Sequence, residues 1–132
     1  MAEFPTDQPS APNDHKLILA SRVEDTPVYN NSGERIGHID DLSIDRRGGN
    51  VVYAIMSFGG FLGIGKRFHP LPWSLLDYDP QQGGYVVSLD EQALRDAPHY
   101  DEEELGRLGG ALHDDYRLQL NDYYSRYGFM GF

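Results

Sequence analysis

The chain has 132 residues, no cysteine, and a formal net charge of −10 from 21 acidic and 11 basic side chains. This is the length of one domain, and the lack of cysteine excludes disulfides and thiolate metal sites. Nucleic-acid binding depends on Lys and Arg neutralising phosphates, so we expect no nucleic-acid partner. No stretch approaches the ~18 apolar residues of a membrane span, and no secretion signal opens the chain. We therefore expect a cytoplasmic protein without direct membrane insertion.

Residues 1–14 contain three Pro and many small polar residues, so we predict a disordered N-terminal lead. From Lys16 to Leu89 the chain has the pattern of β structure throughout, beginning with the apolar run Lys16–Ala20. Gly, Asn and Pro separate the predicted strands at short intervals, which is typical of a small barrel or sandwich. The predicted strands are Val28–Tyr29, Arg35–Asp45, Val51–Phe58, Lys66–Leu71 and Tyr85–Leu89.

The second of these strands has an irregular apolar spacing. Its apolar residues are Ile36, Ile39, Leu42 and Ile44. A helix fits the first three, but β-branched residues and a following Gly turn favour a strand with a bulge near Gly37 or Asp40–Asp41. Farther on, Pro70 and Pro72 prevent a helix and limit ladder hydrogen bonds, so we expect Trp73–Leu76 at a barrel corner or a sheet edge.

The last third of the chain has helical signals. Asp90 is a good N-cap for a helix over Glu91–Ala97, which Pro98 ends. Asp101 and Glu104 have capping-box spacing. After Gly109–Gly110, an apolar stripe at helical spacing predicts a helix of about four turns. Its members are Leu112, Tyr116, Leu120, Tyr123, Tyr124 and Tyr127. The stripe fits packing on the chain's own barrel, or an interface with a partner or a second copy.

A series of turn and strand segments follows one another with a recognisable order and spacing. The segments are Gly33–Leu42, Val51–Ile55, Gly59–Asp79, Tyr85–Val87 and Leu94–Pro98. Together they resemble the PRC-barrel family, named after the barrel of the photosynthetic reaction centre H subunit. The resemblance implies a compact barrel of five or six strands and an adaptor role. In the reaction centre such a barrel rests at the cytoplasmic face of the membrane, and in ribosome maturation factors it contacts a ribosomal protein. These systems share no reaction, so the resemblance specifies the fold better than the function.

We therefore predict a mainly β, PRC-barrel-like domain over residues 15–100 with a short helix, followed by a helical C-terminal extension over residues 101–132. The predicted function is that of a non-enzymatic adaptor, which binds a protein partner. Self-association as a homodimer is a further prediction. Two groups are the candidate partner-binding residues: the apolar loop tip Phe61, Leu62 and Ile64, and the helical stripe residues Tyr116, Leu120 and Tyr124. We expect no catalytic, cofactor or metal site.

One alternative is a phosphate-binding or enzyme-like site at Gly60–Lys66, which matches G-x-x-x-x-G-K. Arg67 follows where a P-loop has Ser or Thr, and the next residues fit a strand instead of a helix. His38 and His69 could meet across strands as a metal pair. The acids Asp40, Asp41 and Asp45 lack the pattern of a calcium loop.

Overall fold

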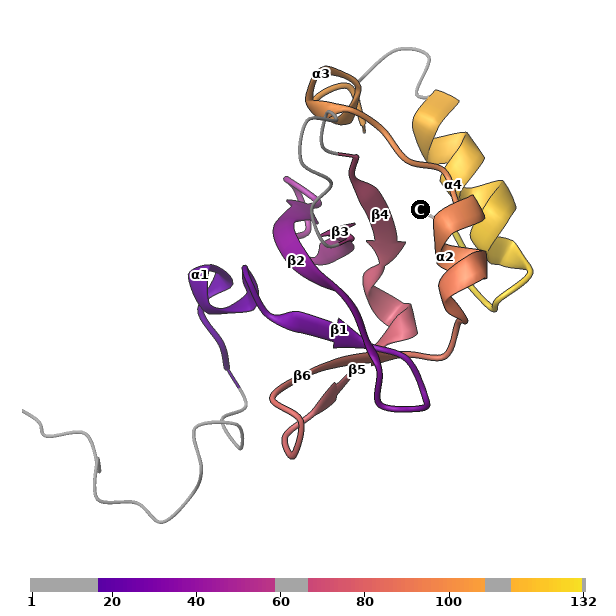
Figure 1. Cartoon of the computed structure of the whole chain (residues 1–132). Coiled ribbons are helices and arrows are strands. Elements are labelled where there is room, and N and C mark those ends of the chain that lie inside the picture. The colour runs from indigo at the N-terminus through magenta and orange to yellow at the C-terminus, as the bar shows by residue number, and fades with distance from the viewer. Residues whose placement is uncertain (1–16, 59–66, 109–114, 132) are drawn as a thin grey trace, which may run out of the picture.

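Six short strands form one curled sheet in the computed structural model, which describes residues 17–58, 67–108 and 115–131 (Figure 1). The strand order is β4-β3-β2-β1-β6-β5. The mainly β, PRC-barrel-like architecture is confirmed, but the sheet is an open half-barrel, with β4 and β5 at its two edges. The strands are β1 Pro27–Tyr29, β2 Arg35–Ile44, β3 Val51–Ser57, β4 His69–Pro72, β5 Leu76–Asp79 and β6 Gly84–Val87.

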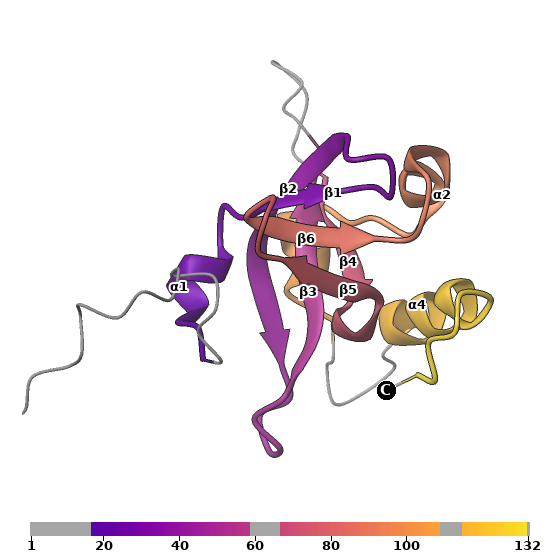
Figure 2. The ribbon, with the colours of Figure 1, turned by 90° about the horizontal axis from the view of Figure 1, so that it is seen from below.

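The pairing of β1 with β6 joins the two halves of the sheet. It is parallel, with Val28 opposite Tyr85, whereas β1–β2, β2–β3, β3–β4 and β5–β6 are antiparallel. Gly84 permits this approach, because a Cβ atom there would lie 2.5 Å from the carbonyl oxygen of Pro27. A strand contributed early in the chain thus lies beside one contributed late (Figure 2).

The predicted bulge in β2 is confirmed. The β2–β3 register steps from Ile39 opposite Met56 to Asp41 opposite Ile55, which leaves Asp40 unmatched. β2 can lie close to β3 at Gly37 because glycine has no Cβ atom. A Cβ atom at this position would lie 2.5 Å from the Ser57 carbonyl oxygen.

The predicted β structure at Lys16–Ala20 is wrong where the structure describes it. Ala20–Val23 forms the single-turn helix α1, and Leu17–Leu19 precedes it without strand pairing. The helical turn places Val23 in the core, with 2% exposure. Asp25 then adopts φ +67 and donates its N–H to the Ile39 carbonyl. An apolar run this short does not distinguish strand from helix by periodicity.

The predicted helix caps are confirmed. Asp90 accepts the Ala93 N–H at the start of α2, Glu91–Asp96. Asp101 and Glu104 form the complete capping box of α3, Glu102–Leu105. The final helix α4 is described over Asp115–Ser125, which is about three turns. Leu112 lies outside the described residues.

Helices α2 and α4 lie side by side over one side of the sheet (Figures 1 and 2). Leu94 of α2 and Leu120 and Tyr124 of α4 are fully buried, in the same hydrophobic cluster as Tyr53 of β3 and Leu71 of β4. The residues after the barrel therefore complete its core within a single chain.

Tyr123 and Tyr124 form a matched pair for testing this packing. The Tyr123 hydroxyl donates to the Ala93 carbonyl at 2.5 Å. The buried Tyr124 hydroxyl has no hydrogen-bond partner among the described residues, and burial raises the pKa of Tyr124.

We predict that Tyr124→Phe stabilises the protein by up to about 1 kcal/mol, because it removes a buried, unpaired hydroxyl. Tyr123→Phe, the control, destabilises it by about 1 kcal/mol through loss of a hydrogen bond. Urea unfolding of both variants measures the difference. Equal destabilisation by the two changes would contradict this packing.

Candidate interaction site

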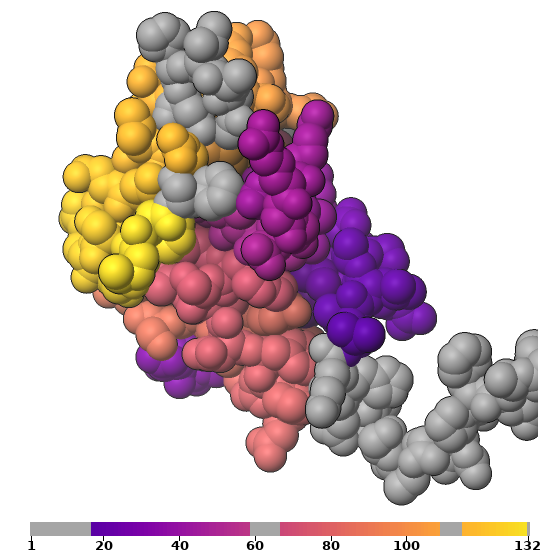
Figure 3. Space-filling view, turned by 180° about the vertical axis from the view of Figure 1, so that it is seen from behind, coloured from indigo at the N-terminus to yellow at the C-terminus, as the bar shows by residue number. Residues whose placement is uncertain are grey.

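Three consecutive apolar residues stand off the barrel at its N-terminal side. Leu17, Ile18 and Leu19 are 88%, 52% and 69% exposed. We call them the N-terminal arm. The arm continues from α1 as an extended trace (Figure 1), and α1 lies on the opposite side from α4 in the space-filling view (Figure 3). Contiguous exposed apolar side chains on a folded domain mark an interaction site.

The two edges of the sheet differ in their capacity to accept another strand. β4 contains Pro70 and Pro72, which have no N–H to donate. Just before β4, Phe68 exchanges two backbone hydrogen bonds with Tyr100, at 2.8 and 2.9 Å. By contrast, β5 contains no proline and pairs only with β6 among the described strands. The two edge strands therefore differ in their backbone donors, since every residue of β5 has an N–H group and two residues of β4 have none.

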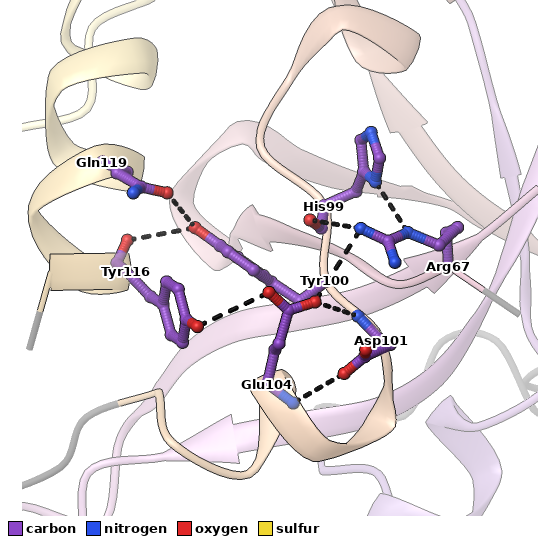
Figure 4. A network of polar contacts seen from close by, with 7 residues as sticks. All are labelled: Arg67, His99, Tyr100, Asp101, Glu104, Tyr116 and Gln119. Atoms are coloured by element: carbon purple, nitrogen blue, oxygen red, sulfur yellow. Dashed lines mark hydrogen bonds and ion pairs between the residues drawn. The ribbon is translucent and has the colours of Figure 1, made fainter.

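A polar network fastens the C-terminal helices to the β4 end of the sheet (Figure 4). Arg67 donates from Nε to Nδ1 of His99 at 2.9 Å and lies 3.9 Å from the Glu104 carboxylate. Tyr100 donates its hydroxyl to Oε1 of Gln119 on α4 at 3.0 Å. The Tyr116 hydroxyl reaches Oε2 of Glu104 at 3.5 Å. These contacts connect Arg67, just before β4, with α3 and α4, so the network positions the helices.

Beside this network lies an aromatic pair that combines a buried and an exposed imidazole. His69 of β4 is 5% exposed, and its ring centroid lies 5.1 Å from that of His99 and 4.7 Å from that of Phe58. Its Nδ1 has no hydrogen-bond partner in the described part of the chain. Burial, with His99, Arg67 and Arg95 nearby, lowers the pKa of His69 to about 4. Burial and Arg67 also lower the pKa of His99.

A Ser, a His and an Asp meet at the β2–β3 pair. Nε2 of His38 lies 3.2 Å from Oδ1 of Asp40 and 3.3 Å from the Ser57 hydroxyl. A relay requires the two partners on opposite ring nitrogens, so that one nitrogen accepts the serine proton while the other is held by the carboxylate. Here both partners contact the same nitrogen, and this arrangement does not activate Ser57.

The structure describes one of the two predicted groups of site residues, the stripe on α4. Leu120 and Tyr124 are 0% exposed, and Tyr116 is half-buried with its ring centroid 4.5 Å from that of Tyr100. The loop tip Phe61, Leu62 and Ile64, and the Gly60–Lys66 phosphate-binding alternative, lie outside the described residues.

The alternative metal pair, His38 and His69, has different neighbours at its two members. His38 contacts Asp40 and Ser57, whereas His69 lies against His99. In residues 17–58, 67–108 and 115–131, no three His, Asp or Glu side chains form a group that could hold a metal ion.

Sequence reasoning missed the N-terminal arm and the His69–His99 pair. The apolar run Leu17–Leu19 is visible in the sequence. The sequence analysis, however, predicts that the run belongs to a strand, and a strand would bury it. The imidazole pair had none, because β4 and the segment after α2 meet only through tertiary structure.

We predict that His69 makes the stability fall in mild acid. The pKa of His69 in the folded protein lies below its ordinary value of 6.5, so between the two values the unfolded chain binds a proton at His69 and the folded chain does not. The contribution of His69 is fully present above pH 6.5 and declines as the pH falls to about 4, by at most about 3 kcal/mol.

Urea unfolding of wild type and His69→Gln across this pH range measures the effect. The variant should lose less stability on acidification than the wild type. Parallel pH profiles of the two proteins would refute the assignment to His69.

Helices long and apolar enough to cross a bilayer do not occur among the described residues.

No curated protein matches the chain. A solved structure described as a 16S ribosomal RNA processing protein, RimM, of Pseudomonas aeruginosa shares 20% identity at a TM-score of 0.39. The match covers 63% of this chain and 50% of that one, so this chain spans about half the length of that protein. The model of the PRC-barrel domain matches residues 15–94, more than half of the chain. The chain belongs to the PRC-barrel domain family.

Proposed function

We propose that this domain is a non-enzymatic protein-interaction module that works in the cytoplasm. The observation that carries the proposal is the exposure of the N-terminal arm, Leu17–Leu19. Exposing three adjacent apolar side chains to water costs free energy in proportion to their exposed area. A protein surface that covers them removes this cost. This supports adaptor binding through the arm.

The burial of the stripe on α4 also favours the arm as the binding surface. Leu120 and Tyr124 are fully covered by the chain's own core, so they offer no surface while α4 lies in this position. The loop tip at Phe61, Leu62 and Ile64 stays a second proposed contact, on the sequence argument alone.

The chemistry of the described polar groups supports a binding role over an enzymatic one. The Ser57, His38 and Asp40 group places both hydrogen bonds on one ring nitrogen. The Arg67, His99 and Glu104 group is engaged in joining β4 to the helices. The net charge of −10 supports a protein partner over nucleic acid.

We predict that the arm determines partner capture. The test is affinity capture from the native cell with the full chain, its Leu17→Asp/Leu19→Asp variant, and an Ile44→Asp control. Ile44 is 52% exposed on β2, so this control adds a charge at a similarly exposed apolar position outside the arm.

Wild type and control should recover the same protein in equal amounts. The arm variant should recover at least about tenfold less, because each 1.4 kcal/mol of lost apolar contact is a factor of ten. Equal recovery by all three proteins would contradict the proposed function.

A further inference from the structure

We propose that His69 and His99 form an acid-sensitive latch, which holds residues 99–105 against β4 while both imidazoles are neutral and releases them when the imidazoles gain protons. We call residues 99–105 the latch segment; it follows α2 along the chain and includes α3. The inference goes beyond the proposed function, because it describes a conformational change that does not involve the N-terminal arm.

The first argument is the hydrogen bond between Arg67 and His99 (Figure 4). Nε of Arg67 donates to Nδ1 of His99 at 2.9 Å. A ring nitrogen that accepts a hydrogen bond carries no proton, so this bond requires a neutral His99. A proton on Nδ1 would face the Arg67 N–H and place two positive charges side by side. Protonation of His99 therefore breaks a bond that joins the latch segment to the residue before β4.

The second argument is the burial of His69. Its side chain is 5% exposed, and its Nδ1 has no hydrogen-bond partner in the described part of the chain. A protonated imidazole donates from both ring nitrogens. Protonation in place would therefore bury a charged donor without an acceptor, 5.1 Å from the ring centroid of His99. The protonated form favours a state in which His69 meets water.

The charged groups around the two imidazoles act mostly in the same direction. His69 is faced by His99, by Arg67 before β4 and by Arg95 of α2, and burial together with these groups lowers its pKa to about 4. Burial and Arg67 lower the pKa of His99, and the carboxylate of Glu104 on α3 opposes them. The closed state therefore binds protons less readily than an open one at both residues, so acid favours opening.

The backbone contacts indicate that the latch segment can open without the sheet. Phe68 and Tyr100 join it to the β4 side through two backbone hydrogen bonds, whereas β4 pairs with β3 along all four of its residues. Leu120 and Tyr124 keep α4 in the core. Segments with fewer backbone bonds open at a lower free energy than the sheet that carries them. Opening of this segment uncovers Tyr100, which is 3% exposed.

Hydrogen exchange of the full chain at pH 7 and pH 5, corrected for the exchange rates of an unstructured chain, measures the opening constant of single amides. The reporter is the Tyr100 amide, which donates to the Phe68 carbonyl, and the reference is the Ile39 amide, which donates to the Thr26 carbonyl. Tyr100 should open more readily than Ile39 at both pH values. Its opening constant should rise at least about tenfold from pH 7 to pH 5, because each proton taken up gives up to a factor of ten per pH unit.

His69→Gln and His99→Gln each remove one titrating group, and glutamine at position 99 keeps a neutral acceptor for Arg67. Each single variant should show a smaller rise than the wild type, and the double variant should show the smallest. His38→Gln is the matched control, because it removes an imidazole of β2 that contacts Asp40 and Ser57. It should keep the full rise.

A rise of wild-type size in the two single variants would overturn the latch, as would its loss in His38→Gln. Equal opening constants for the Tyr100 and Ile39 amides would also overturn it, because the latch segment would then open only with the whole domain. No variant changes the N-terminal arm, so these results are distinguishable from a failure of the proposed function.

Discussion

Leu120 and Tyr124 of α4 are buried against the chain's own half-barrel, and this contact attaches the C-terminal helices to the sheet. The sheet is open between β4 and β5, and helices α2 and α4 cover its apolar side. Burying one leucine side chain fully is worth roughly 1.5–3 kcal/mol, so these residues hold the helical layer in place. The Phe68–Tyr100 bridge and the Arg67 network fix where that layer meets β4.

Because Leu120 and Tyr124 of the C-terminal stripe are buried in the core, the exposed apolar surface lies elsewhere. Among the described residues, the N-terminal arm is a contiguous part of it, and single exposed apolar residues lie at Ile44, Leu118 and Met130.

The features predicted correctly are those that depend on neighbouring residues in the sequence. Asp90 and Asp101 cap helices, and Asp40 lies at the bulge. The parallel β1–β6 pairing was beyond reach, because it joins distant segments and depends on the close approach at Gly84. The stripe on α4 indicated a buried face without indicating which surface buries it. The apolar run before Ala20 was too short to assign, and its exposure is a tertiary property.

Hydrogen–deuterium exchange of the full chain at low and high concentration shows whether α4 packs on its own barrel or on another chain. If α4 packs on its own barrel, the amides of Asp115–Ser125 are protected equally at both concentrations. Protection of α4 that appears only at high concentration would contradict it, because the helix would then find its partner on another chain.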